Sequence, residues 1–267
     1  MASKRSMWKY ILIGGGILIL IVVIFFLFQL YYHPKTNYDS YSNEPIKHDL
    51  FTEVLNEHVN QEGFVNYDGL AADRSGLDEY LKMLRSNHPG SNWTEEEKLA
   101  YWINAYNAFT LEIVLDHYPL ESIRHIRRWS LPFINSVWDI KFIDIQEETY
   151  SLNNIEHDIL RIEFGEPRIH FAINCASYSC PKLLNEAYSA DKLEEQLQAQ
   201  AIDFINDPLR NKISKDKAEI SQIFLWFKGD FTKDGSVMEY VNQFAETPSA
   251  GGVKPSHLEY NWDLNKQ

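Results

Sequence analysis

Apolar residues recur at steps of three and four through the first part of the chain that follows residue 45. This spacing predicts helices at 48–59 and 77–84, and a longer one that begins at a Thr94–Glu97 capping box and ends before Pro119. The longer segment is apolar at nearly every turn. We therefore expect it to be the buried central helix of the fold.

The rest of the chain mixes helical spacing with the alternation typical of strands. The patterns predict helices at 151–164, 191–205 and 236–244, and strands at 138–145, 168–174 and 218–227. No internal repeat or low-complexity linker divides residues 46–267. We predict an α+β fold, one helix-rich globular domain with a small antiparallel sheet.

The N-terminus has the pattern of a membrane anchor. Residues 1–9 carry three cations and no acid, and residues 10–30 are apolar or glycine except for Gln29. A helix of this length spans a hydrocarbon core of about 30 Å, and the basic flank favours a cytoplasmic N-terminus. The predicted order is a cytoplasmic tail at 1–9, a single transmembrane signal anchor at 10–32, a tether at 33–45 and a soluble periplasmic or extracellular domain at 46–267.

Composition and charge restrict the partners that this chain can have. The 267 residues are 45% hydrophobic, which is enough for one sizeable core, and the formal net charge is −13. Nucleic acids bind basic faces, so we expect no nucleic-acid partner. The expected partners are the membrane, through the N-terminal helix, and a protein or peptide ligand.

Several common mechanisms have no motif in this sequence. The glycine-framed serine of lipases, the glycine-rich phosphate loop, the H-E-x-x-H zinc motif and the C-x-x-C pair are all absent. We predict no cofactor and no metal. The chemistry that remains is that of Cys175 and Cys180, which lie together in the segment from Arg168 to Pro181.

A thiolate attacks acyl carbon well when a histidine or a helix N-terminus lowers its pKa. Cys175 follows the predicted strand and is the candidate nucleophile, whereas Cys180 precedes a short helix predicted at 182–188. His157 is the preferred base, because the first turn of a helix disfavours the imidazolium. His170 is a second candidate, although residues 170 and 175 of a regular strand point to opposite faces. Asn104 is a supporting amide of the site, or a structural amide that bonds a nearby loop.

Two other interpretations of these residues stay open. Cys175 and Cys180 can form a local disulfide on the oxidising side of a membrane, with His157 and His170 as core histidines. A metal site built from His157, His170 and Glu156 is a third interpretation, but their spacing matches no standard ligand set.

Five motifs occur in one order along the chain: Tyr101–Ala108, Ile155–Arg161, Pro167–Cys175 with Ser179–Pro181, Ile223–Phe227 with Asp230–Phe231, and Tyr260–Asn265. Together they resemble the uncharacterised domain-of-unknown-function family 547, over most of residues 48–265. This family is similar to papain-like and transglutaminase-like thiol hydrolases, so the resemblance implies a thiol-hydrolase fold. In those hydrolases the nucleophilic cysteine opens the central helix and a histidine follows it. The helix from Thr94 has no cysteine, and only His257 follows Cys180.

The leading hypothesis is a membrane-anchored extracytoplasmic protein with a thiol hydrolase or acyl-transfer site at Cys175 and His157. The alternative is a non-catalytic cell-envelope binding or scaffold domain in which Cys175 and Cys180 form a structural disulfide.

Overall fold

The computed structural model describes residues 16, 20–22, 36–41, 43–126 and 136–267. It separates into two compact units, Met1–Thr36 and Asn37–Gln267. Most of the anchor predicted at 10–32 lies outside the described residues. Within it, only residues 16 and 20–22 are described, and these are helical. No helix among the described residues is both long enough and apolar enough to cross a membrane.

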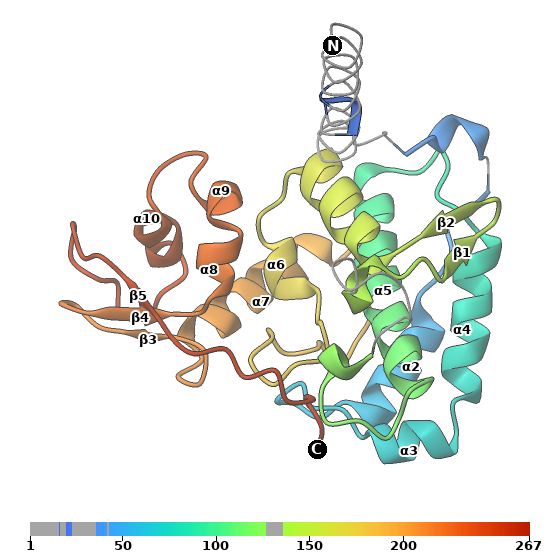
Figure 1. The fold of residues 1–267 in the computed structure, drawn as a ribbon, viewed down its shortest axis with the longest axis horizontal. Coiled ribbons are helices and arrows are strands. Elements are labelled where there is room, and N and C mark those ends of the chain that lie inside the picture. The colour runs from blue at the N-terminus through green and yellow to red at the C-terminus, as the bar shows by residue number, and fades with distance from the viewer. Residues whose placement is uncertain (1–15, 17–19, 23–35, 42, 127–135) are drawn as a thin grey trace, which may run out of the picture. The chain divides into compact units, whose positions relative to one another are not determined.

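The second unit begins with helices packed around one long central helix (Figure 1). In order, these elements are η1 Tyr38–Ser40, α2 Asp49–His58, α3 Tyr67–Ala72, α4 Ser75–Ser86 and α5 Glu95–Leu115. Both halves of the Thr94–Glu97 capping box are formed, and 17 residues of α5 are buried. The predicted central helix is therefore confirmed. It ends at Leu115, a few residues before the proline at 119.

A hairpin and an unusual helix follow. The short elements η2 Ile123–His125 and η3 Val137–Asp139 precede strands β1 Ile143–Ile145 and β2 Glu148–Tyr150, which pair antiparallel. Next comes η4, Asn154–Phe164, an 11-residue π-helix that ends at Gly165 in the left-handed region, with φ at 63°. The sequence predicted an ordinary helix here. A π-helix has wider turns, and such turns are frequent at functional sites.

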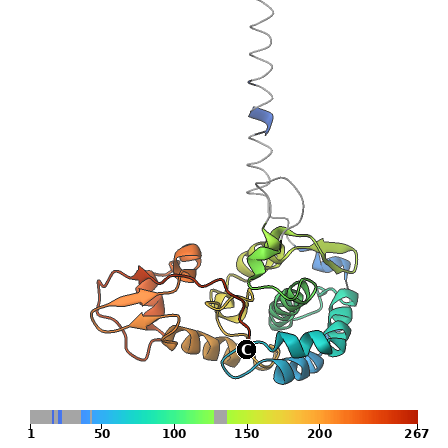
Figure 2. The same ribbon diagram turned by 60° about the horizontal axis from the view of Figure 1, so that its bottom comes forward.

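The last part of the chain forms a second group of elements beside the first (Figures 1 and 2). They are α6 Ile169–Ala172, α7 Leu193–Asn206, β3 Lys212–Ile213, β4 Ala218–Ile220, α8 Ile223–Trp226, α9 Lys228–Phe231, α10 Val237–Asn242 and β5 Ser256–His257. β4 lies between β3, which is antiparallel to it, and β5, which is parallel to it. The helix-rich α+β fold with small sheets is thus confirmed, although one strand pair is parallel.

Four local predictions are wrong, at least in part. Of the strand predicted at 138–145, only residues 143–145 form β1, whereas 137–139 form η3. Residues 169–172 form the helix α6 rather than a strand, and all four are buried, so their alternating polarity did not mark the two faces of a sheet. In the segment predicted as one long strand, β4 ends at Ile220 and α8 begins at Ile223. Residues 182–188 are not helical. The backbone N–H of Tyr188, for example, donates to the side chain of Asn104 instead.

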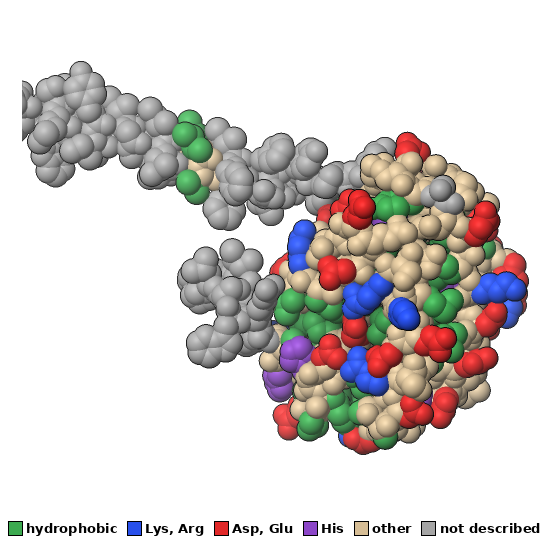
Figure 3. Space-filling model, turned by 90° about the vertical axis from the view of Figure 1, so that its right-hand side faces the viewer, with side chains coloured by type: hydrophobic (Ala, Val, Ile, Leu, Met, Phe, Trp, Pro, Cys, Tyr) green, Lys and Arg blue, Asp and Glu red, His purple; other side chains and the backbone are tan. Residues whose placement is uncertain are grey.

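Two hydrophobic cores meet inside the second unit. The larger surrounds α5, and the smaller lies between α7, β4 and helices α8 to α10. Helix α6 contributes Ile169 to the larger core and Phe171 to the smaller one. Helix α7 likewise contributes Leu197 to the larger core and Phe204 to the smaller one. On the face drawn in Figure 3, acidic and basic side chains are interspersed. The seam between the cores is where the thiols lie.

Candidate functional site

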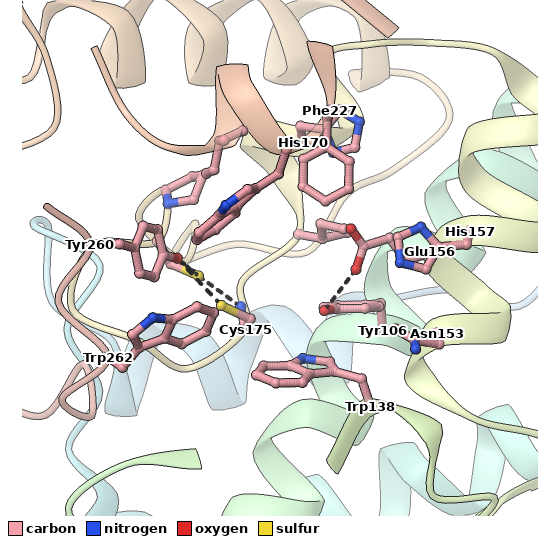
Figure 4. Close-up of a pocket in the computed structure, with 15 residues that line it drawn as sticks. Tyr106, Trp138, Asn153, Glu156, His157, His170, Cys175, Phe227, Tyr260 and Trp262 are labelled. Carbon is pink, nitrogen blue, oxygen red and sulfur yellow. Dashed lines mark hydrogen bonds between the residues drawn. The ribbon is translucent and has the colours of Figure 1, made fainter. Parts of the chain in front are cut away.

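A cavity of about 210 Å³ opens between the two cores. Its walls come from α5, η3, the start of η4, α6, α8 and the C-terminal segment, which are distant in sequence. Four of the predicted site residues line it: Cys175, Cys180, His157 and His170. Figure 4 shows this cavity with aromatic rings along its walls. A cavity at the junction of two cores is a common place for a ligand site.

The loop that carries the thiols, residues 174–181, is held from both sides. Asn107 of α5 accepts a hydrogen bond from the backbone N–H of Asn174 (2.8 Å), and Asn174 donates to the carbonyl of Pro181 (2.7 Å). From the other side, the backbone N–H of Tyr178 donates to the carbonyl of Asp263 (2.7 Å). The C-terminal segment therefore positions the loop, although it follows it by more than 80 residues.

Both cysteines are free thiols. Cys180 is 3% exposed, and its Sγ accepts hydrogen bonds from the backbone N–H of Cys175 (3.0 Å) and from the hydroxyl of Tyr260 (3.3 Å). The Sγ of Cys175 lies 3.3 Å from the hydroxyl of Ser177, which is itself 2.9 Å from the hydroxyl of Tyr260. Two sulfurs and two hydroxyls thus form one compact network, of which Figure 4 draws a part.

This network makes one thiol acidic. Burial raises the pKa of Cys180, but hydrogen bonds from Cys175, Ser177 and Tyr260 stabilise its thiolate and lower that pKa to about 6. The hydrogen bond to Cys180, burial and the neighbouring charge all raise the pKa of Cys175. Of the two sulfurs, Cys180 is therefore the one whose surroundings favour the thiolate. The sequence predicted a helix N-terminus as the cause of this acidity, and the structure replaces it with individual donors.

The two predicted histidines belong to a chain of charged groups beside the cavity. His170 Nε2 donates to Asp230 (2.7 Å), Asp230 pairs with Arg161 (2.6 Å), and Arg161 donates to His157 Nδ1 (2.8 Å). Asp230 is partly buried, which raises its pKa, yet the hydrogen bonds from His170 and Arg161 outweigh burial and lower it. Asp230 is thus an anion at neutral pH.

Neither histidine makes a hydrogen bond to a thiol among the described residues. Because arginine only donates, the Nδ1 of His157 is an acceptor and its proton is on Nε2. Burial, followed by the charge of Arg161, lowers the pKa of His157 to about 4. The ring of His170 stacks on Phe227 with centroids 4.0 Å apart, and burial lowers its pKa despite Asp230. Both rings are neutral at pH 7.

A carboxyl group that the sequence did not single out for catalysis lies in the same cavity. Glu156, on the π-helix η4, is 8% exposed, and its Oε2 accepts a hydrogen bond from the hydroxyl of Tyr106 at 3.3 Å. Burial raises the pKa of Glu156 to about 7, against the effect of that hydrogen bond. In the view of Figure 4, Glu156 and Cys175 lie on opposite sides of the cavity. The site thus contains both a thiol with a lowered pKa and a carboxyl group with a raised one.

Asn104 is the one predicted site residue that does not line the cavity. It is fully buried in α5, where its amide donates to the carbonyl of Tyr188 (2.8 Å) and accepts from the N–H of the same residue (2.9 Å). Among the described residues, no group of three or more His, Cys, Asp or Glu side chains is placed to hold a metal ion.

Two further groups of this site, Asp230 and Tyr260, were not predicted from the sequence, and Glu156 was considered there only as a metal ligand. Each lies within a motif that carries the family resemblance, and this was the only signal that could have found them. Nothing in local spacing indicates that residues 156, 230 and 260 approach the thiols, because their contacts depend on the tertiary fold.

Comparison with known proteins gave one match. Neither the curated proteins nor the solved structures contain a match to this chain, and nothing found supports the likeness to papain-like or transglutaminase-like hydrolases. A family model matches the segment 90–205, which runs from the loop before α5 into the last turn of α7 and includes η4 and both thiols. Residues 90–205 match the family described as "Protein of unknown function, DUF547", in agreement with the resemblance seen in the motifs.

Proposed function

We propose that the cavity is a thiol-dependent acyl hydrolase or acyl-transfer site, with Cys180 as its nucleophile. One observation carries the proposal: an acidified thiol and a carboxyl group with a pKa near neutrality line the same largely apolar cavity. Perturbed groups with identifiable partners, gathered in one cavity, are the usual mark of a reactive site. The role first assigned to Cys175 passes to Cys180, which has the donors.

The proposed reaction has two steps. In the first, the Cys180 thiolate attacks the acyl carbon of an ester, thioester or amide, and a thioester to Cys180 forms as the bond to the leaving group breaks. Protonated Glu156 gives its proton to the leaving group. In the second step, Glu156 as carboxylate takes a proton from water or from an acceptor nucleophile, which attacks the thioester and releases the thiolate.

Other residues of the site have supporting roles. Cys175, through its N–H, and Tyr260, through its hydroxyl, hold Cys180 in the thiolate form. His170 and Asp230 are positioning residues, since His170 stacks on Phe227 and Asp230 binds both His170 and Arg161. Phe227 is itself a wall of the cavity. The original preference for His157 as the base has no support from its contacts.

Reaction with p-nitrophenyl acetate tests this proposal without knowledge of the natural substrate. The native chain should release a burst of p-nitrophenolate, followed by slower turnover as the acetyl thioester is hydrolysed. Cys180→Ala should abolish the burst. Cys175→Ala should keep a slower one, because the backbone N–H that it donates remains. A burst of unchanged size in Cys180→Ala would refute the assignment.

The membrane anchor at residues 10–32 stays a prediction. The hydropathy of that segment supports it. Membranes from cells that express the full chain should retain it after an alkaline carbonate wash, whereas a chain that begins at Asn37, where the second compact unit starts, should be released. Release of the full chain by the wash would contradict the prediction.

A further inference from the structure

We infer that the acyl group admitted to this cavity is uncharged and apolar, a short aliphatic chain or a single ring. This inference rests on the proposed acyl chemistry and adds the substrate class to it. It follows from three properties of the cavity, namely its size, the side chains that form its walls, and the charges around it.

The size and the walls fit a compact hydrophobic group. At about 210 Å³ the cavity is larger than the roughly 150 Å³ engineered cavity that binds benzene. Ile173, Ile223 and Phe227 form part of its apolar lining. Trp226 and Trp262 also line it, and they stack with centroids 5.7 Å apart and an angle of 24° between their planes. Trp226 is 46% exposed, so part of its indole is available to contact a ligand.

Several polar groups of the cavity already form hydrogen bonds with one another. The Tyr106 hydroxyl donates to Glu156, and the Tyr260 hydroxyl contacts Cys180 and Ser177. A sugar or another ligand rich in hydroxyl groups needs several unengaged partners, because a buried polar group without a hydrogen bond is costly. The cavity therefore favours a ligand group that has no hydrogen bonds to satisfy.

The charges disfavour an anionic acyl group. No lysine or arginine is among the described residues that line the cavity. Arg161, which lies over Phe227, is paired with Asp230, and the guanidinium of Arg124 lies over the ring of Trp262. The thiolate of Cys180 would repel a carboxylate on the acyl group, and Glu156 would add to this repulsion whenever it is ionised.

A series of p-nitrophenyl esters tests the inference: acetate, butyrate, hexanoate and the negatively charged hydrogen glutarate. The measured quantity is the second-order rate constant of acylation, normalised to the reaction of each ester with a small thiol. Each buried methylene contributes about fourfold. Hexanoate has four methylenes more than acetate, so burial of only two of them should make it react about fifteenfold faster than acetate. Hydrogen glutarate should react more slowly than butyrate.

Two variants on α8 provide a matched comparison. Trp226→Ala should reduce the preference for hexanoate over acetate by about fivefold or more. Leu225→Ala, at a neighbouring residue that is 50% exposed and does not line the cavity, should leave it unchanged. Equal normalised rates for all esters, or a preference for hydrogen glutarate, would overturn the inference while thiol acylation still stands. No acylation with any ester would overturn the proposed function as well.

Discussion

The acidity of Cys180 depends on a small number of donors, and Tyr260 is the one that can be removed most cleanly. Its hydroxyl lies 3.3 Å from the Sγ of Cys180. A hydrogen bond to a charged group contributes about 1.5–3 kcal/mol, and one pKa unit corresponds to about 1.4 kcal/mol. Tyr260→Phe should therefore raise the pKa of Cys180 by about one to two units from its value of about 6.

The pH dependence of alkylation by iodoacetamide measures this shift, with the modified peptide identified by mass spectrometry. At pH 6 the native thiol is about half ionised, and a rise of one to two units reduces the labelling rate by about fivefold to fiftyfold. Tyr178→Phe is the matched control, because Tyr178 belongs to the same loop but is 37% exposed and packs against Phe64. It should leave the pKa unchanged. A pKa near 6 in Tyr260→Phe would refute the argument.

Two further predictions concern stability. Glu156 has a pKa raised from 4.5 to about 7, so its protonated form stabilises the fold below pH 4.5, and this contribution is lost as the pH rises through 7. In urea unfolding, the free energy of unfolding of the native chain should fall by about 2–3 kcal/mol more than that of Glu156→Gln between pH 5 and pH 8. Equal losses in the two proteins would contradict the assigned pKa. Asn104→Ala leaves two buried backbone groups of Tyr188 without partners and should lower the free energy of unfolding by about 2–4 kcal/mol. The purified, folded variant should still give the burst with p-nitrophenyl acetate. Loss of the burst would assign Asn104 to the site.

The parts of the fold that the sequence predicted are those with strong local signals. Helix α5 has both a capping box and an apolar face, and α7 has an amphipathic pattern, so both were found within a few residues of their ends. The strand predicted at 168–174 was wrong because His170 alternates with apolar neighbours as in a strand, although residues 169–172 form α6. Its polarity instead reflects a hydrogen bond to Asp230, 60 positions away.

In the candidate site, too, the residues with a conspicuous local signal were predicted and the contacts made by the tertiary fold were not. The thiols and histidines were found because cysteine and histidine are chemically conspicuous, and four of the five predicted residues do line one cavity. The relation between them was not predictable. The donors to Cys180 include Tyr260, 80 residues later, and the reactive carboxyl group of Glu156 depends on burial that no local pattern reports. The π-helix that carries Glu156 has an apolar spacing close to that of an ordinary helix.

The most direct test of the central claim is to trap the acyl-enzyme. The native chain is mixed with p-nitrophenyl acetate, quenched in acid within the burst, digested without reductant, and the acetylated residue is identified by mass spectrometry. The expected product is a thioester on Cys180, with Cys175 unmodified and not joined to it by a disulfide. Acetylation only at residues outside the cavity, or a disulfide between the two cysteines in protein that still gives the burst, would contradict it.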